Sequence, residues 1–213
     1  MKMQLMIALI AVIVLASAGD AHVPETPDWE PRPGVTLGLQ LQSTRLSVRD
    51  TPPVPAEDRV LIAEEGGGAV LSVGYTFTPR FALLLAVSGS VHETDRPGRD
   101  VNLATAVLEA HYRIRTGTRW QPFFFGGLGG ATVRFEDDDL DAKIRGGVAV
   151  AGAGVNLHLS RRWRLELAGR LDFINWDRIE VERPTEGGRV ILEDPVDEEG
   201  RAGKIHLGAV FAF

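Results

Sequence analysis

Hydroxyl, imidazole and carboxylate side chains gather between Ser88 and Asp95, where they could support acyl transfer. Ser90 and His92 are two positions apart, so in an extended strand they share a face, as a nucleophile and its general base require. Glu93 follows and could supply an acidic partner. Polar residues are also common where a strand ends and a loop begins, and the segment matches no motif of lipid-modifying enzymes. The sequence therefore does not predict an enzyme.

A second candidate for chemistry is the acidic run that follows residue 136. Asp137, Asp139 and Asp141 have the alternate spacing of a calcium-binding loop. Ala142 stands where such a loop needs glycine, and Val148 stands where it needs a closing glutamate. These two mismatches favour a solvated acidic loop, so we predict no metal site and no cofactor.

Other titratable side chains recur at every second position, opposite small, aliphatic or aromatic residues. This alternation is typical of strands that have one apolar and one polar face. In a closed eight-stranded barrel the polar faces would meet in a narrow lumen, where unpaired charges are costly. We therefore predict a paired lumen polar network formed by Glu109, His111, Arg113, Asn156, His158, Arg164, Glu166, Arg170 and Asp172. Lys204 and His206 share its face in the last segment.

Eight segments show this alternation of polar and apolar residues. In the glycine-rich fifth segment, 122–135, the assignment of residues to the two faces is ambiguous. Most of the segments run for about ten residues, the length that a tilted strand needs to cross a bilayer. Their connections alternate in length. Short links are expected at 78–80, 115–120 and 160–162, and long ones at 46–68, 92–100, 136–145 and 174–203. The fold class predicted is all-β, an eight-stranded antiparallel up-and-down transmembrane β-barrel with tight turns on one rim and polar loops on the other.

Aromatic residues lie near the tight-turn ends of the segments. Aromatic side chains at one rim are typical of the girdle that marks a membrane interface. A soluble barrel of the lipocalin type would instead turn its aliphatic face inward and spread aromatics through the core. The predicted aromatic girdle consists of Phe77, Phe81, Tyr112, Trp120, Phe123, Trp163, Phe211 and Phe213.

The chain has 213 residues, a net charge of -6 and no cysteine. The acidic balance argues against a nucleic-acid partner, and the lack of cysteine excludes disulfides and thiol chemistry. Lys2, an apolar run and the small residues before position 19 indicate a secretory signal peptide at 1–18, cleaved after Ala18 or Ala21. A proline-rich leader at 19–33 would then precede a barrel domain at 34–213.

The last residues carry the most specific motif. A polar residue, a glycine two positions later and two alternating aromatics, the last one terminal, resemble the C-terminal assembly signal of bacterial outer-membrane barrels. The matching positions are His206, Gly208, Phe211 and Phe213. With the aromatic and glycine-rich segment 121–129, this makes residues 34–213 resemble small barrels of the OmpA/OmpX type. The resemblance implies the bacterial outer membrane, recognition by the β-barrel assembly machinery, and contact with outer-membrane lipid and lipopolysaccharide.

Three functional hypotheses follow. The leading one is a structural or adhesive barrel with a plugged lumen, whose long extracellular loops contact the environment or a ligand that the sequence does not identify; we expect it to be a monomer. The alternative is a transport barrel for small or hydrophobic solutes, similar to the OmpW-like family. The second alternative is an outer-membrane enzyme that modifies lipid A.

Overall fold

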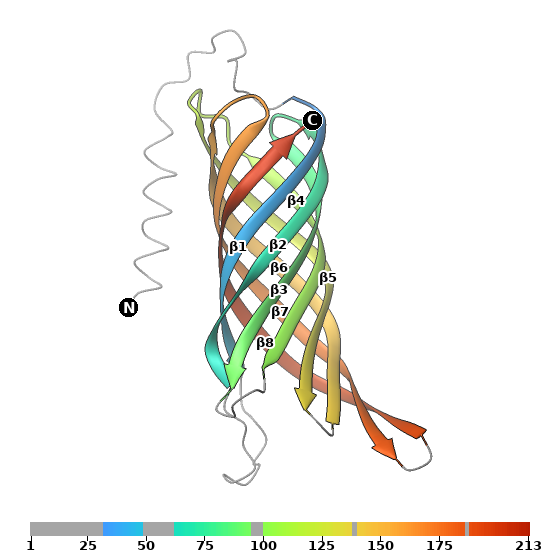
Figure 1. Cartoon of the computed structure of the whole chain (residues 1–213). Helices are drawn as coiled ribbons and strands as arrows, with labels where there is room; N and C mark the ends of the chain where they lie inside the picture. Colours follow the sequence, from blue (N-terminus) through green and yellow to red (C-terminus); the bar gives the residue numbers. More distant parts are fainter. Residues whose placement is uncertain (1–31, 49–61, 95–99, 138–139, 186–187) are drawn as a thin grey trace.

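The computed structural model describes residues 32–48, 62–94, 100–137, 140–185 and 188–213. The predicted signal peptide and nearly all of the predicted leader lie outside the described residues. Eight strands form one closed barrel, in which each strand pairs antiparallel with the next and the last pairs with the first (Figure 1). The strands are β1 (Gly34–Val48), β2 (Ile62–Thr78), β3 (Phe81–Thr94), β4 (Val101–Arg113), β5 (Trp120–Asp137), β6 (Leu140–His158), β7 (Trp163–Thr185) and β8 (Gly188–Ala212). The predicted fold class is confirmed.

The barrel wall has an aliphatic outer face and a polar inner face. Along β4 the side chains alternate between buried and exposed, so that Leu108 is 58% exposed while its neighbour Glu109 is 5% exposed. Leucines on other strands are more exposed still; Leu41 and Leu128 reach 73% and 72%. An apolar surface that continues around a whole molecule marks contact with a membrane. The lipocalin-like alternative, with aliphatic side chains inside, is therefore wrong.

The sequence predicts short connections between strands at one rim and longer ones at the other. Two of the predicted long loops, however, are mostly strand. The β5–β6 ladder continues to the pair Asp137 and Leu140, and the β7–β8 ladder continues to the pair Thr185 and Gly188. The expected loops at 136–145 and 174–203 are thus corrected to extended hairpins. Charged residues alternate with apolar ones at 140–145 and at 178–182, a pattern that suits a strand in water as well as a loop.

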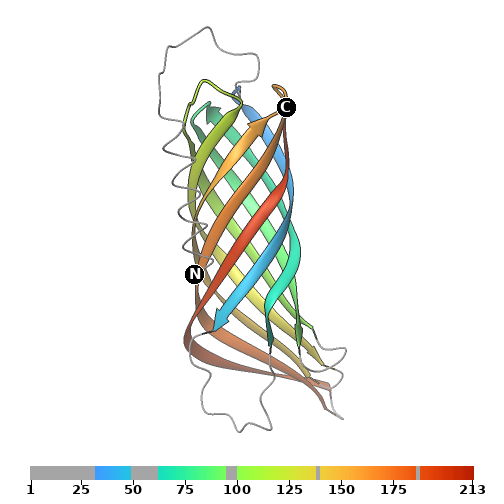
Figure 2. The ribbon, with the colours of Figure 1, turned by 90° about the vertical axis from the view of Figure 1, so that its left-hand side faces the viewer.

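A bulge changes the direction of the longest hairpin. The β6–β7 and β7–β8 registers both shift next to Asp177, between Trp176 and Arg178 on β7. Bulges bend a strand and increase its twist. Beyond this point the β7–β8 hairpin leans away from the barrel at the loop-side rim, as Figures 1 and 2 show. The loop side therefore carries a projecting platform of paired strands.

The structure corrects one member of the predicted aromatic girdle. Phe123 is only 1% exposed and points into the lumen, so its place in the girdle is wrong. Its inward direction is possible because the facing strand carries Gly154, where a Cβ would lie 2.7 Å from the tip of the Phe123 ring. Gly152 makes room for Phe125 in the same way. The glycines of β6 therefore accommodate the aromatic side chains of β5.

Gly152→Ala should destabilise the barrel by about 1–3 kcal/mol, because the new methyl group overlaps the Phe125 ring and the Gly169 carbonyl. Gly147→Ala on the same strand is the matched control, since a Cβ there meets nothing within 4 Å. Urea unfolding of the protein in lipid vesicles measures both. Equal midpoints for the two variants would contradict the packing described here.

Candidate functional site

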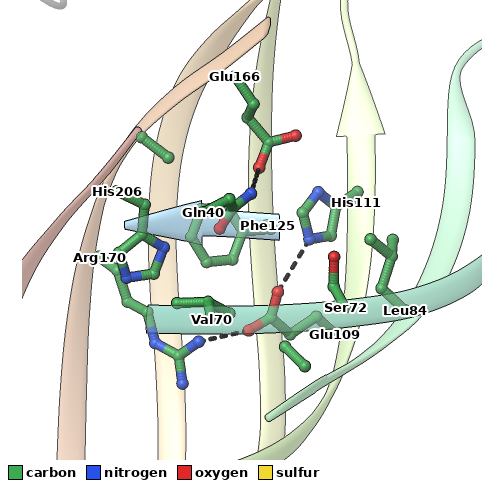
Figure 3. Close-up of a pocket in the computed structure, with 12 residues that line it drawn as sticks. Gln40, Val70, Ser72, Leu84, Glu109, His111, Phe125, Glu166, Arg170 and His206 are labelled. Atoms are coloured by element: carbon green, nitrogen blue, oxygen red, sulfur yellow. Dashed lines mark hydrogen bonds and ion pairs between the residues drawn. The ribbon is translucent and has the colours of Figure 1, made fainter. Parts of the chain in front are cut away.

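The centre of the lumen holds a network of charged side chains from opposite walls. On β4, Glu109 Oε2 lies 3.0 Å from His111 Nε2. The other carboxylate oxygen, Oε1, lies 2.6 Å from Nη1 of Arg170 on β7 (Figure 3). All three side chains are buried. The ion pair therefore connects two strands that are not neighbours in the wall.

Asp172 continues this network by joining two cations. Its Oδ1 lies 2.5 Å from Arg170 Nε, and its Oδ2 lies 2.8 Å from Lys204 Nζ on β8. Lys204 Nζ also donates a hydrogen bond to Ser88 Oγ at 3.3 Å, and Ser88 shares a hydrogen bond of 2.7 Å with Thr105. Two carboxylates thus neutralise two cations at the centre of the barrel, and each cation has partners that are fixed by strand register.

Polar side chains continue toward the tight-turn rim. Asn156 and His158 of β6 pair in register with Glu166 and Arg164 of β7. Gln40 Nε2 donates a hydrogen bond of 2.6 Å to Glu166 Oε1. Further contacts join His158 Nε2 to Gln121 Oε1 at 3.1 Å, and Arg113 Nη1 to Thr76 Oγ1 at 3.4 Å. The predicted lumen residues thus all lie on the inner face.

Aromatic rings close the space beside the ion pairs. The His111 ring stacks against both Phe123 and Phe125, with centroid distances of 5.4 Å and 4.9 Å. The cavity lined by Glu109, His111, Phe125, Arg170 and their neighbours has a volume of only about 20 Å³ (Figure 3). That volume holds one or two water molecules. The polar network therefore fills the lumen at this level.

An apolar cluster occupies one side of the loop-side half of the lumen. Val101, Leu103 and Val107 from β4 are buried against Val148 and Ile174 from the walls opposite. These side chains belong to the inward face of their strands and have almost no solvent contact. Nearer the loop side than the ion pairs, the lumen therefore holds this apolar cluster on one side and the buried Ser90 and His92 of β3 at the same level.

The candidate catalytic pair does not form an open site. Ser90 Oγ and His92 Nε2 lie 3.2 Å apart, within reach of proton transfer, but both side chains are buried inside the barrel and away from lipid. The side chains of Asp137, Asp139 and Asp141 lie outside the described residues. In the described part of the chain, no group of three or more His, Cys, Asp or Glu side chains is placed to hold a metal ion.

The structure places the other predicted girdle residues on the outer face at the tight-turn side. Phe77, Phe81, Tyr112, Trp120, Trp163 and Phe213 are exposed, and Phe211 is partly exposed. Phe211 packs on Trp163 and Phe213, with both centroid distances at 4.8 Å. Two aromatics that the prediction did not include, Tyr75 and Phe124, are exposed as well.

The residues of the predicted assembly signal occupy two faces of β8. His206 is buried in the lumen, whereas Phe211 and Phe213 belong to the aromatic band. Gly208 permits a close approach of the first strand, since a Cβ there would overlap the Leu39 carbonyl and the Cα of Gln40. The strand that carries the motif closes the barrel against β1.

Sequence reasoning missed several members of the network. Gln40, Thr76, Ser88, Thr105 and Gln121 all make hydrogen bonds inside the lumen. Each has the inward parity of its strand, so the alternation contained the signal. Uncharged polar residues were passed over because their partners depend on contacts across the lumen, which single strands do not reveal.

Comparisons with known proteins agree with this architecture. The family model described as outer membrane protein beta-barrel domain matches residues 7–182. Neisserial surface protein A is 14% identical, with a TM-score of 0.63, and the match covers 84% of this chain and 97% of that one. The Ail attachment invasion locus protein of Yersinia pestis is 11% identical, with a TM-score of 0.51, and 84% and 99% of the chains are covered. At such identities the likeness shows the fold alone.

OprG from Pseudomonas aeruginosa is a third similar structure. It is 12% identical, with a TM-score of 0.50, and the match covers 88% of this chain and 99% of that one. A search of curated proteins found no match.

Proposed function

Because the chain belongs to the family of outer membrane protein beta-barrel domains, we propose that its barrel is a closed structural platform whose loop-side strands contact the cell's surroundings. The chain is an integral outer-membrane β-barrel protein, and its specific role is the proposal. The observation that carries it is the filling of the lumen among the described residues: ion pairs cross it where the cavity beside Glu109 and Arg170 measures about 20 Å³, and buried side chains occupy the lumen on the loop side of them. A barrel without a water-filled passage has only its rims and outer wall with which to act.

The loop-side rim offers the surface for such contact. There the β5–β6 and β7–β8 hairpins continue beyond the strands β2–β4 and form an extended sheet (Figure 1). Arg145 of β6 and Glu180 of β7 form an ion pair of 3.2 Å on this sheet, with the arginine side chain half exposed. Paired strands hold their side chains in place better than free loops do, which lowers the entropic cost of binding a partner.

The contact role can be tested by shortening the hairpin. Replacing residues 181–192 with a two-residue turn removes the tip of β7 and β8 and leaves the barrel registers unchanged. We expect unchanged heat-modified mobility on a denaturing gel and loss of cell-to-cell or surface adherence. Equal adherence of cells that carry the full-length and the shortened chain would contradict an adhesive role of this hairpin.

The closed lumen predicts no steady ion conductance. Purified protein in a planar bilayer should show at most rare, brief openings, because ions would have to displace charged side chains that are held by several partners. A double variant, Glu109→Ala with Arg170→Ala, removes one crossing ion pair and should raise the frequency of openings. Stable channels of uniform size in the unaltered protein would overturn the proposal of a plugged platform.

One observation favours transport of apolar solutes as a second candidate. On the side of β4 to β7, the loop-side half of the lumen holds a cluster of valine, leucine and isoleucine. A hydrophobic solute that enters from this side would meet a compatible surface. Uptake of a fluorescent alkane analogue into proteoliposomes tests this candidate, and a rate equal to that of empty liposomes would exclude it.

A further inference from the structure

Each of the three tight turns ends in an arginine, and the next strand begins with an aromatic residue directly after it. We call such a pair an arginine–aromatic unit. The pairs are Arg80–Phe81 at β3, Arg119–Trp120 at β5 and Arg162–Trp163 at β7. The three arginines are exposed, and the aromatic rings lie on the outer face with 38%, 55% and 50% of their surface exposed. We call the three arginines the arginine collar.

The charged side chains of the rim around the collar all have one sign. The described residues of this rim, 32–33, 78–80, 114–119 and 159–162, contain arginine and no lysine, aspartate or glutamate. On the opposite side, acidic residues outnumber basic ones in each of the segments 46–68, 92–100, 136–145 and 174–203. The two ends of the barrel therefore differ in electrostatic potential.

From this arrangement we propose that the arginine collar binds the phosphate groups of anionic phospholipids in the leaflet at the tight-turn rim. The aromatic rings fix how deep the barrel sits in the membrane, because aromatic side chains, Trp above all, prefer the headgroup region. An arginine beside such a ring extends its guanidinium into the headgroups, where it binds phosphate oxygens through two parallel hydrogen bonds. Three such units around the rim form a band of phosphate sites.

The rim selects anionic lipid over zwitterionic lipid by its lack of acidic partners. The ammonium group of phosphatidylethanolamine would meet arginine side chains and find no side-chain carboxylate on the described rim. Phosphatidylglycerol has no ammonium group, so its phosphate meets the collar without repulsion. Each basic residue near an anionic surface adds attraction that salt weakens. The preference should therefore fall as ionic strength rises.

Tryptophan fluorescence can measure this preference at the site. Trp120 and Trp163 follow collar arginines, so Trp29→Phe and Trp176→Phe give a protein whose emission comes from these two rings. The protein is reconstituted in phosphatidylethanolamine vesicles with a minor fraction of phosphatidylglycerol, and either lipid carries brominated acyl chains as a quencher. We expect phosphatidylglycerol to be enriched about threefold beside the rings relative to its bulk fraction at low salt.

Two triple variants decide whether the collar causes the enrichment. Arg80→Gln, Arg119→Gln and Arg162→Gln together should abolish it. Arg134→Gln, Arg178→Gln and Arg201→Gln remove the same charge from exposed positions on the loop side and should leave it intact. Heat-modified mobility checks that each variant is folded. If the collar variant does not fold, Arg119→Gln with Trp120 as the only tryptophan repeats the test at one unit.

Three results would overturn the proposal. The first is equal quenching by the two brominated lipids in the unaltered protein. The second is enrichment that survives loss of the collar, since another surface would then hold the lipid. The third is an equal loss in both triple variants, because net charge rather than the collar would then be the cause.

Discussion

Asp172→Ala is expected to destabilise the barrel by about 3–5 kcal/mol, the largest effect of any single substitution in the lumen. Asp172 is the only carboxylate bound by both Arg170 and Lys204 among the ion pairs that the described residues form. Its removal leaves two buried cations, of which Arg170 keeps Glu109 and Lys204 keeps only the Ser88 hydroxyl. The cost is the desolvation of cations that no longer have sufficient negative charge nearby.

Urea unfolding in lipid vesicles measures this effect, and two further variants establish its cause. Asp172→Ala with Lys204→Met should recover part of the loss, because the second change removes the cation that Asp172 held. Glu180→Ala breaks the exposed pair with Arg145 and should cost less than about 1 kcal/mol. If Asp172→Ala proved as mild as Glu180→Ala, the ionic layer would not hold the barrel walls together.

Leu108→Lys should have the second largest effect and acts on the opposite face of the wall. Leu108 lies four residues before Tyr112, which belongs to the aromatic band. With a rise of about 3.3 Å per residue and a tilt of about 45°, its depth inside that band is about 9 Å, more than halfway from the interface to the middle of the hydrocarbon layer. A lysine costs about 2–4 kcal/mol at the middle of the layer and about 0–1 kcal/mol at its edges, so we expect a loss of about 2 kcal/mol here.

The control for Leu108→Lys is Thr118→Lys, which places the same charge on an exposed turn outside the aromatic band. This second variant loses exposed hydrogen bonds between the Thr118 hydroxyl and the backbone of Trp120, so it should lower the free energy of unfolding in vesicles by less than about 1 kcal/mol. Two results would show that the outer face does not meet lipid. One is an equal loss of unfolding free energy in the two variants. The other is a Leu108→Lys variant that folds as well in water as in vesicles.

The fold was accessible from the sequence where alternation is strict. In β4 every second residue from Ala104 to Tyr112 is small, aliphatic or aromatic, and the residues between them include Glu109 and His111. Since a strand turns successive side chains to opposite faces, this pattern fixes which face meets lipid. The C-terminal motif added the cellular compartment, which the periodicity of the strands does not contain.

Other features were inaccessible because they depend on neighbours across the barrel. The direction of Phe123 follows from the space that Gly154 leaves on the adjacent strand, and glycine carries no polarity that marks a face. The positions of the ion pairs and of the apolar cluster inside the lumen depend on how far each strand is staggered against the next. The β7–β8 hairpin was expected to be a loop because its charges lack an aliphatic face for lipid, although they are compatible with strand pairing in water.

The barrel's central property is that small and aliphatic side chains face lipid while the polar faces close the lumen. The chain has no cysteine, so single cysteines at each position from 104 to 111 can carry a nitroxide label without background. In vesicles, accessibility to oxygen should alternate: it should be high at Ala104, Ala106, Leu108 and Ala110, and low at Thr105, Val107, Glu109 and His111. The opposite alternation, or high accessibility of position 108 to a water-soluble nickel complex, would contradict a membrane-spanning barrel with a closed polar interior.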